Sequence, residues 1–256
     1  MNNGQPKLST VATGGAILAL IVFAIATKIS ATATYDYKPG ELLVVEGGKS
    51  PDKKFSIVSG EGKKGFGVYL MDAQTKKVIG QLEEVATGLD SAPDAYNAHW
   101  SADSKHVGIS SREDRHLMRN VIYRVENRRA YLVETPQLLC HAVPEFCRLQ
   151  KDLGGALQLD SENYYDTPWK VRQNEDASEI IKWISPTHFI VSEESQWQVK
   201  ERDPSKAIGE YGDVEKLEHE PGEADDRYHV WFNAEGECEL LPGDKSRVIN
   251  THPVKK

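Results

Sequence analysis

The sequence predicts a mainly β protein built from antiparallel four-stranded units, with a hydrophobic helix at its N-terminus. Three observations predict this class. Short segments rich in Val, Ile and aromatic residues alternate with Gly-, Asp- and Ser-containing turns. A five-residue turn sequence at 50–54 returns in similar form at 101–105. An almost wholly apolar segment, residues 11–27, precedes all of these features.

The eight clearest strand segments fall in the first half of the chain. They cover residues 41–46, 54–59, 65–71, 76–82, 98–101, 106–111, 119–125 and 129–135. Only short turns separate the members of each set of four, and connections of this length favour antiparallel neighbours. We therefore expect two successive antiparallel groups of four strands.

The apolar segment 11–27 is typical of a secretory signal peptide, because Ala31-Thr32-Ala33 follows it as a small-x-small cleavage site. An uncleaved membrane anchor is the alternative, since a spanning helix needs about 20 apolar residues. The chain then divides into residues 1–33 and a body of residues 34–256. The body is expected to be periplasmic or secreted, and it meets a membrane only through residues 11–27 if these are retained.

Composition narrows the class of partner. The chain has 256 residues, of which 39% are hydrophobic and 27% charged, as in a globular protein with a sizeable core. The formal net charge of −8 argues against non-specific binding to nucleic acid. A protein partner is expected instead.

The spacing of the strand segments suggests repetition. Ser50–Lys54 and Ser101–Lys105 align with a period of 51 residues. A weaker third copy begins within 182–195, and a last hairpin is expected around Asn-Ala-Glu-Gly in 228–241. Four strands in a period of this length are typical of propeller blades. Residues 136–180 and 201–227 are expected to be irregular insertions, the first with one or two helical turns.

The two turn sequences carry a family resemblance. HWSADSKHVGIS (99–110) and SPDKKFSIV (50–58) resemble the Trp-Ser-Pro-Asp-Gly-Lys hairpin of TolB-like and WD-repeat-type β-propeller repeats. The resemblance implies a partial or small propeller in which the Asp accepts turn hydrogen bonds and the Gly supplies a positive φ. Lys53 and Ser104 stand here where the family has Gly.

Gly60-Glu61-Gly62-Lys63-Lys64-Gly65 matches the dinucleotide-binding pattern G-x-G-x-x-G. That pattern requires a helix next, so that the helix N-terminus faces the pyrophosphate. A strand segment follows here, and we therefore interpret these residues as a hairpin loop. No cofactor is expected.

Aromatic side chains supply the candidate ligand-binding residues, which are Tyr164, Tyr165, Trp169 and Trp197. Their clustering suggests a surface binding site, with packing in the core as the alternative. Trp100, Trp183 and Trp231 are interpreted as core aromatics on strands, and His99 as a structural histidine.

One segment is dense in metal-ligating residue types. The candidate ligands are Glu218, His219, Glu220, Asp225, Asp226 and His229. Carboxylates and imidazoles could hold a divalent cation if the backbone folded around it. A solvated acidic surface is the alternative.

Three cysteines are present, and Cys140 and Cys147 are close enough in sequence to pair across a loop. If residues 136–150 were helical, the two would lie about 10 Å apart, too far for a disulfide. Unpaired thiols are therefore the alternative.

These patterns favour an exported, non-catalytic binding or scaffolding module with a protein partner. One alternative is a hydrolase or lyase whose active site is assembled from the segments 136–180 and 201–227. Another is a structural subunit completed by a partner chain. The sequence leaves the question of enzymatic activity open, with a non-catalytic role favoured.

Overall fold

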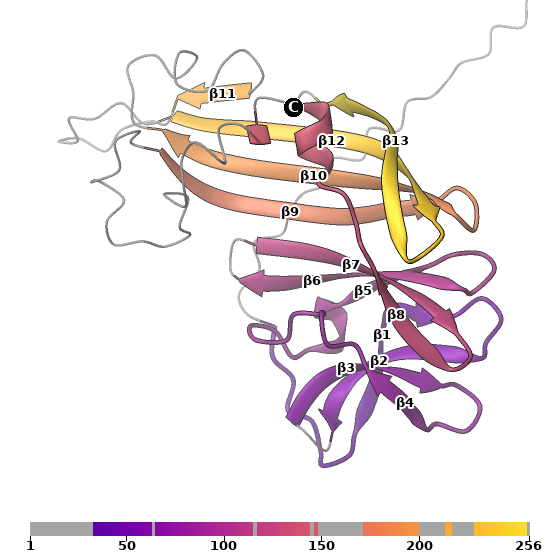
Figure 1. Ribbon diagram of the computed structural model, residues 1–256. Coiled ribbons are helices and arrows are strands. Elements are labelled where there is room, and N and C mark those ends of the chain that lie inside the picture. Colours follow the sequence, from indigo (N-terminus) through magenta and orange to yellow (C-terminus); the bar gives the residue numbers. More distant parts are fainter. Residues whose placement is uncertain are drawn as a thin grey trace, which may run out of the picture. The chain divides into compact units, whose positions relative to one another are not determined.

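The computed structural model describes residues 33–62, 65–114, 117–143, 146–147, 171–199, 213–216 and 228–254 (Figure 1). All of them belong to one compact unit, residues 31–256. The signal-peptide or anchor segment 11–27 and the hydrophobic helix expected there lie outside the described residues. Within these residues, no helix is long and apolar enough to cross a membrane.

The first antiparallel group contains four strands, as the sequence predicts. They are β1 (Leu42–Lys49), β2 (Phe55–Gly62), β3 (Gly65–Asp72) and β4 (Val78–Gln81). Each strand pairs with the next one in the chain, for example through Val58 opposite Tyr69. Alternation along these strands directs Ile57, Val68 and Leu70 into the core.

The second antiparallel group follows a short 3-10 helix, η1 (Pro93–Ala95). Its strands are β5 (Asn97–Trp100), β6 (His106–Asp114), β7 (Leu117–Glu126) and β8 (Arg129–Val133). They also pair in chain order. All eight strands predicted for the first half of the chain are confirmed.

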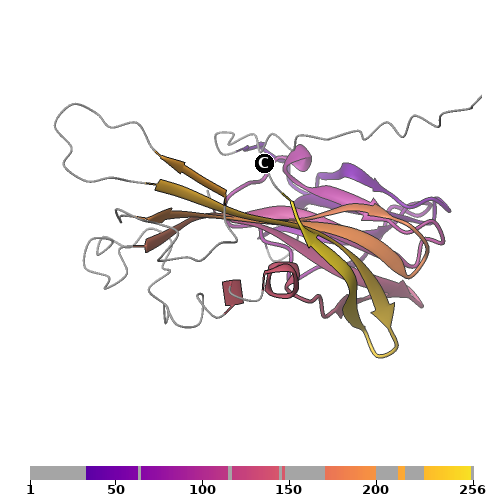
Figure 2. The ribbon, with the colours of Figure 1, turned by 90° about the horizontal axis from the view of Figure 1, so that it is seen from above.

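The third group carries the longest strands. It consists of α1 (Leu138–Ala142), β9 (Val171–Trp183), β10 (His188–Val199), β11 (Asp213–Lys216), β12 (Tyr228–Leu241) and β13 (Lys245–Pro253). β10 pairs with β9 and β12 on its two sides, and the three strands run side by side in both views (Figures 1 and 2). β11 and β13 share the outer edge of β12.

Two parallel junctions merge these groups. Glu46 of β1 pairs with Asn97 of β5, and Leu117 and Met118 of β7 pair with Asp176 and Ala177 of β9. The described strands therefore form one open mixed sheet in the order β11-β12-β10-β9-β7-β6-β5-β1-β2-β3-β4, with β13 beside β12 and β8 beside β7. The prediction of a propeller is wrong, because the strands form one continuous unclosed sheet and not separate blades arranged in a ring.

Two boundaries in the second half also differ from the predictions. The expected hairpin around Asn233–Gly236 is instead the middle of the continuous strand β12, where side chains alternate between buried and partly exposed. The chain turns later, where Gly243 and Asp244 have φ of 81° and 57°. Residues 171–180, expected to be irregular, form most of β9 because their backbone pairs with β10.

The described core has two main clusters, and both include residues of β7. The larger cluster includes Leu138, Phe189, Trp197 and Phe232. The other joins the first two groups through residues such as Ile57 and Ile109. Ile180 of β9 closes over Gly108 of β6, where a Cβ atom would lie 2.1 Å from Ile180 Cδ1. Gly108 therefore lets β9 approach the second group closely.

Candidate functional site

Two hairpin turns of matching construction border the candidate site. In the β1–β2 turn, Ser50 Oγ accepts a hydrogen bond from the N–H of Phe55 and donates to Asp52 Oδ1. In the β5–β6 turn, Ser101 Oγ accepts from the N–H of His106 and donates to Asp103 Oδ1. The repeated sequence thus encodes a turn with serine and aspartate caps.

Two non-glycine residues, Lys53 and Ser104, occupy the turn position at which the propeller repeats have glycine. Lys53 and Ser104 have φ of 60° and 62°, the left-handed conformation that glycine adopts without steric cost. Ser104 gains a compensating contact, because its Oγ accepts a hydrogen bond from the N–H of Asp52 at 3.0 Å. This bond fastens the two turns to each other.

A third serine caps the β9–β10 turn. Ser185 Oγ accepts from the N–H of His188 at 3.1 Å and lies 3.0 Å from His188 Nδ1, and His188 Nε2 lies 3.6 Å from Glu239 Oε1. A serine, a histidine and a carboxylate in series resemble a nucleophilic site. Here the serine and histidine belong to one tight turn, and Ser185 accepts backbone N–H groups as Ser50 and Ser101 do. We therefore interpret Ser185 as a turn cap.

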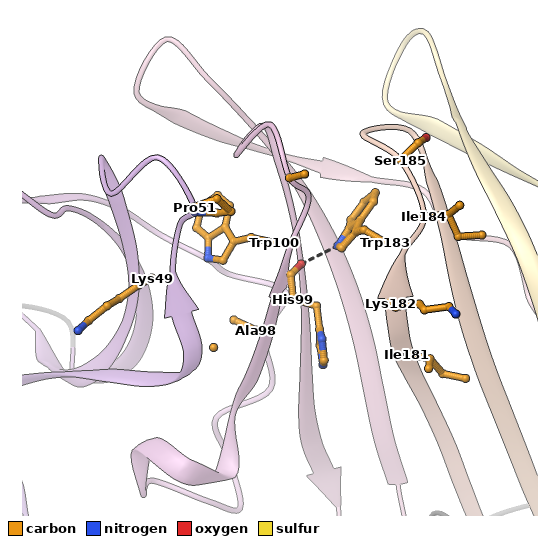
Figure 3. A pocket seen from close by; sticks show the side chains of 12 residues that line it. Lys49, Pro51, Ala98, His99, Trp100, Ile181, Lys182, Trp183, Ile184 and Ser185 are labelled. Atoms are coloured by element: carbon orange, nitrogen blue, oxygen red, sulfur yellow. Dashed lines mark hydrogen bonds between the residues drawn. The ribbon is translucent and has the colours of Figure 1, made fainter. Parts of the chain in front are cut away.

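Two indole groups connect the three turns across the sheet. Trp100 Nε1 of β5 donates to the carbonyl oxygen of Gly48 in β1 at 3.1 Å. Trp183 Nε1 of β9 donates to the carbonyl oxygen of His99 in β5 at 2.8 Å, as the dashed line in Figure 3 shows. Because both indole N–H groups are engaged, the rings offer only apolar surface to a ligand.

A cavity of about 430 Å³ lies between these turns, and we call it the indole pocket. Its lining includes Gly47, Lys49, Pro51, Ala98, His99, Trp100, Ala102, Ile181, Lys182, Trp183, Ile184 and Ser185 (Figure 3). Two of the lining side chains are large, aliphatic and exposed, with 37% of Ile181 and 53% of Ile184 accessible. Its size is within the range of small-molecule and side-chain binding sites.

Irregular backbone shapes two walls of the indole pocket. In β9 the pairing passes from Ile180 opposite Val191 to Lys182 opposite Ile190, so Ile181 is the extra residue of a β-bulge. In β1 Gly47 has a φ of 63°, and a Cβ atom there would lie 2.1 Å from the carbonyl oxygen of Ala98. The bulge and the glycine bend the two strands away from regular pairing beside the pocket.

His99 adds a polar element to the lining. Burial lowers the pKa of its imidazole, partly offset by the charges of Glu179 and Glu46, so the ring is neutral at pH 7. Among the described residues, His99 Nε2 is buried without a hydrogen-bond partner. Lys49 and Lys182 are the charged members of the lining, and both are exposed. The indole pocket is therefore aromatic and aliphatic, with two cationic groups.

Trp197 is the one candidate ligand-binding residue that the structure describes, and it does not line this pocket. Tyr164, Tyr165 and Trp169 lie outside the described residues. Trp197 is 0% exposed, with its ring 5.4 Å from that of Phe146 and 5.1 Å from that of Phe232 between centroids. Its Nε1 donates to Ser195 Oγ at 2.9 Å, so Trp197 belongs to the core, which was the alternative interpretation.

The candidate metal ligands fall mostly outside the described residues. This applies to Glu218, His219, Glu220, Asp225 and Asp226. His229 lies on β12, where its backbone is opposite Glu215 of β11 and Gln198 of β10. Over the described ranges, no group of three His, Cys, Asp or Glu residues is arranged to hold a metal ion.

The cysteines lie beside the larger core cluster. Cys140 and Cys147 form a disulfide with a Cα–Cα distance of 5.1 Å. The distance is short because α1 ends at Ala142, so the two residues do not lie on one continuous helix. Cys238 is a buried free thiol, and burial raises its pKa to about 12. A thiol with such a pKa is a poor nucleophile at neutral pH.

The chain matches no family model, and comparison with curated proteins and with solved structures gives no significant match. The resemblance to TolB-like and WD-repeat-type repeats is wrong, because no such family matches and the described strands form one unclosed mixed sheet. What the two segments share with that family is limited to a short turn. The fold defines an open mixed β-sheet protein, and the indole pocket is its main candidate site.

Most residues of this pocket were not predicted from the sequence as a site. Lys49, Ile181, Lys182 and Ile184 were not singled out, and Trp100 and Trp183 were interpreted as core residues. One signal was available: Ile-Ile-Lys-Trp-Ile at 180–184 breaks the strict alternation of a regular strand. Such a break is what a β-bulge produces.

Proposed function

We propose that this protein is a non-catalytic binding module whose indole pocket receives a large apolar side chain from an extended, acidic segment of a partner protein. The observation that carries the proposal is the placement of Ile181 and Ile184. Both are exposed beside two tryptophans, and Ile181 is held there by a β-bulge. Burying exposed apolar surface of this kind against an apolar side chain of a partner is energetically favourable.

The hydrogen bonding of the pocket supports an apolar occupant. The N–H groups of Trp100 and Trp183 already bind backbone carbonyl oxygens. Ser185 Oγ is occupied by its own turn. A ligand therefore gains few directional hydrogen bonds here, and its affinity would come chiefly from burial of apolar surface.

The charges favour an acidic partner segment. Lys49 and Lys182 contribute two positive charges, and the described lining itself contains no Asp or Glu, while Glu46 and Glu179 act on His99 from just outside it. The formal charge of the whole chain is −8, so this lining is opposite in sign to the protein's average. Complementary charge around an apolar contact raises both the association rate and the selectivity.

A random heptapeptide phage library, selected on the immobilised full-length chain, tests this function. Enriched peptides are expected to carry a Leu, Phe or Trp beside an Asp or Glu. Their synthetic versions should bind at least about ten-fold more weakly to Ile184→Asp, a loss of about 1.4 kcal/mol. Ile249→Asp is the matched control, because Ile249 is similarly exposed on β13 and should bind like wild type. Equal binding to both variants would reject the pocket as the site.

A second candidate, a structural subunit whose sheet is continued by a partner chain, is favoured by a different observation. The sheet is open, and β4 ends one side of its strand order. Unpaired strand edges pair readily with another chain. Sedimentation of the full-length chain across a hundred-fold concentration range tests this candidate. Reversible assembly that Gln81→Pro in β4 abolishes would support it, because the N–H of Gln81 faces away from β3. A monomer at every concentration would exclude continuation by a second copy.

A further inference from the structure

A second cavity of about 670 Å³ lies on the β1–β4 group, away from the residues of the indole pocket. We call it the tyrosine pocket. The lining residues that matter are Leu42, Glu61, Gly62, Tyr69, Val78 and Glu83. They come from all four strands of the first group and from the segment that follows β4. The cavity is large enough to enclose a small organic molecule.

Tyr69 owes its position to two glycines. A Cβ atom on Gly62 would lie 2.2 Å from Tyr69 Oη, and one on Gly67 would lie 2.8 Å from it. The phenol therefore occupies space that only glycine leaves free, and Tyr69 Oη donates to the carbonyl oxygen of Gly65 at 3.2 Å. Gly62 ends β2 and Gly65 begins β3, so their contacts with Tyr69 explain two of the three glycines of the sequence Gly60–Gly65 without a nucleotide.

Aliphatic side chains form the part of the wall beside Tyr69. Tyr69 packs with Val58 and Met71, and Leu42 lies against the same cluster. Val78 on the edge strand β4 is 46% exposed. A ligand with an apolar body would cover Val78 and Leu42 and release the water in contact with them.

The charged groups in the described lining of the tyrosine pocket are carboxylates. Glu61 and Glu83 are both exposed at its rim, and no Lys, Arg or His is among the described lining residues. Burial raises the pKa of Tyr69, and the negative charge of Glu61 raises it further. The phenol is thus neutral at pH 7, and its ring lies in the field of at least one carboxylate.

We propose that the tyrosine pocket binds a small organic cation, an ammonium group attached to an apolar body. Tyr69 is only 6% exposed, so the carboxylates of Glu61 and Glu83 at the rim would supply most of the attraction for the ammonium group, and the small accessible part of the ring would add to it. The apolar body would lie against Leu42 and Val78. This site is independent of the function proposed for the indole pocket, because the two share no lining residue.

Titration of the full-length chain with benzyltrimethylammonium, followed by calorimetry and saturation-transfer NMR, tests the site. We expect binding that is at least ten-fold tighter than that of phenylacetate, which has a similar apolar body and the opposite charge. Glu61→Gln and Glu83→Gln should each weaken binding of the cation about three-fold or more. Glu134→Gln is the matched control, because Glu134 is exposed elsewhere, and it should bind like wild type.

Both substituted glutamates are exposed, so the variants should keep the wild-type circular dichroism and melting temperature, which separates lost binding from lost folding. Equal binding of phenylacetate, or unchanged binding in both glutamine variants, would overturn the proposal. Tighter binding of the peptide acetyl-Gly-Lys-Gly-amide than of benzyltrimethylammonium would also overturn it, because the site would then select a basic side chain of a protein and not a small cation.

Discussion

The indole N–H of Trp183 donates a hydrogen bond to the carbonyl oxygen of His99 over 2.8 Å, across 84 positions of sequence. This bond joins β9 to β5, two strands that do not pair with each other in the sheet. Trp100 makes the corresponding bond to Gly48 of β1. The three groups of strands are thus held together beside the indole pocket by side chains as well as by their two short parallel junctions.

Replacement of Trp183 by Phe should show what this bond contributes. Phe keeps an aromatic ring but cannot donate, which leaves the His99 carbonyl without this partner. We expect the free energy of unfolding to fall by about 1–2 kcal/mol, measured by urea denaturation of the full-length chain. Trp100→Phe should lose a similar amount. An unchanged urea midpoint in Trp183→Phe would show that the bond does not stabilise the fold.

Gly47 and Gly40 form a matched pair for testing the backbone at the indole pocket. Their φ angles are similar, 63° and 77°, but only Gly47 has a neighbour within reach of a Cβ atom. Gly40→Ala should cost about 1 kcal/mol for the left-handed conformation alone. Gly47→Ala should cost at least about 3 kcal/mol, because the carbonyl of Ala98 is backbone and cannot move aside. Thermal and urea unfolding of both variants measure the difference, and equal losses would contradict the close approach.

Substituting glycine for Lys53 and for Ser104 tests whether the left-handed conformation at these positions lowers the stability of the fold. Lys53→Gly should raise the free energy of unfolding by about 0.5–1 kcal/mol, because glycine relieves left-handed strain at some cost in chain entropy. Ser104→Gly should give no such gain, because it also removes the acceptor for the N–H of Asp52. Paired urea titrations check both values. Equal stabilisation by the two substitutions would show that the bond between the turns is negligible.

The same turns explain how far the sequence could predict the fold. Ser50–Lys54 and Ser101–Lys105 determine local structure, since their hydrogen bonds span at most five residues. The positions of the neighbouring strands were therefore predicted correctly. The pairing between groups depends on contacts such as Glu46 with Asn97, which no local pattern encodes. The propeller prediction failed at that step.

Long strands and the pocket escaped prediction for related reasons. Gly236 and Asn233 suggested a turn, yet both lie in the middle of β12. Glycine is needed at position 236 because Leu138 packs where a side chain would be. The indole pocket combines Lys49, Trp100 and Ile184, which are remote in sequence. Each looked ordinary in its own segment, and only the packing of β9 over the second group brings them together.

The ion pair of Asp90 with Arg112 should make the free energy of unfolding depend on pH in the acidic range. Arg112 Nε and Nη2 donate to Asp90 at 2.7 and 2.8 Å, and the N–H of Ala33 donates at 2.7 Å to a carboxylate that is 4% exposed. Burial alone would raise the pKa of Asp90, but the bonds and charge of Arg112, with the bond from Ala33, lower it below its ordinary value. The ionised form is therefore the one that stabilises the fold.

A depressed pKa in the folded state gives stability that is complete above the unfolded pKa, about 3.9, and is lost as the pH falls through the folded value. Asp90→Asn should lower the free energy of unfolding at pH 7 by about 3 kcal/mol, because it replaces the buried carboxylate that binds the Arg112 guanidinium with a neutral amide. The difference from wild type should persist down to about pH 5 and shrink below about pH 4. Urea titrations at pH 7, 5 and 3 measure it, with the exposed Asp94→Asn as control. A difference that stayed constant from pH 7 to 3 would mean that Asp90 acts through packing and not through its charge.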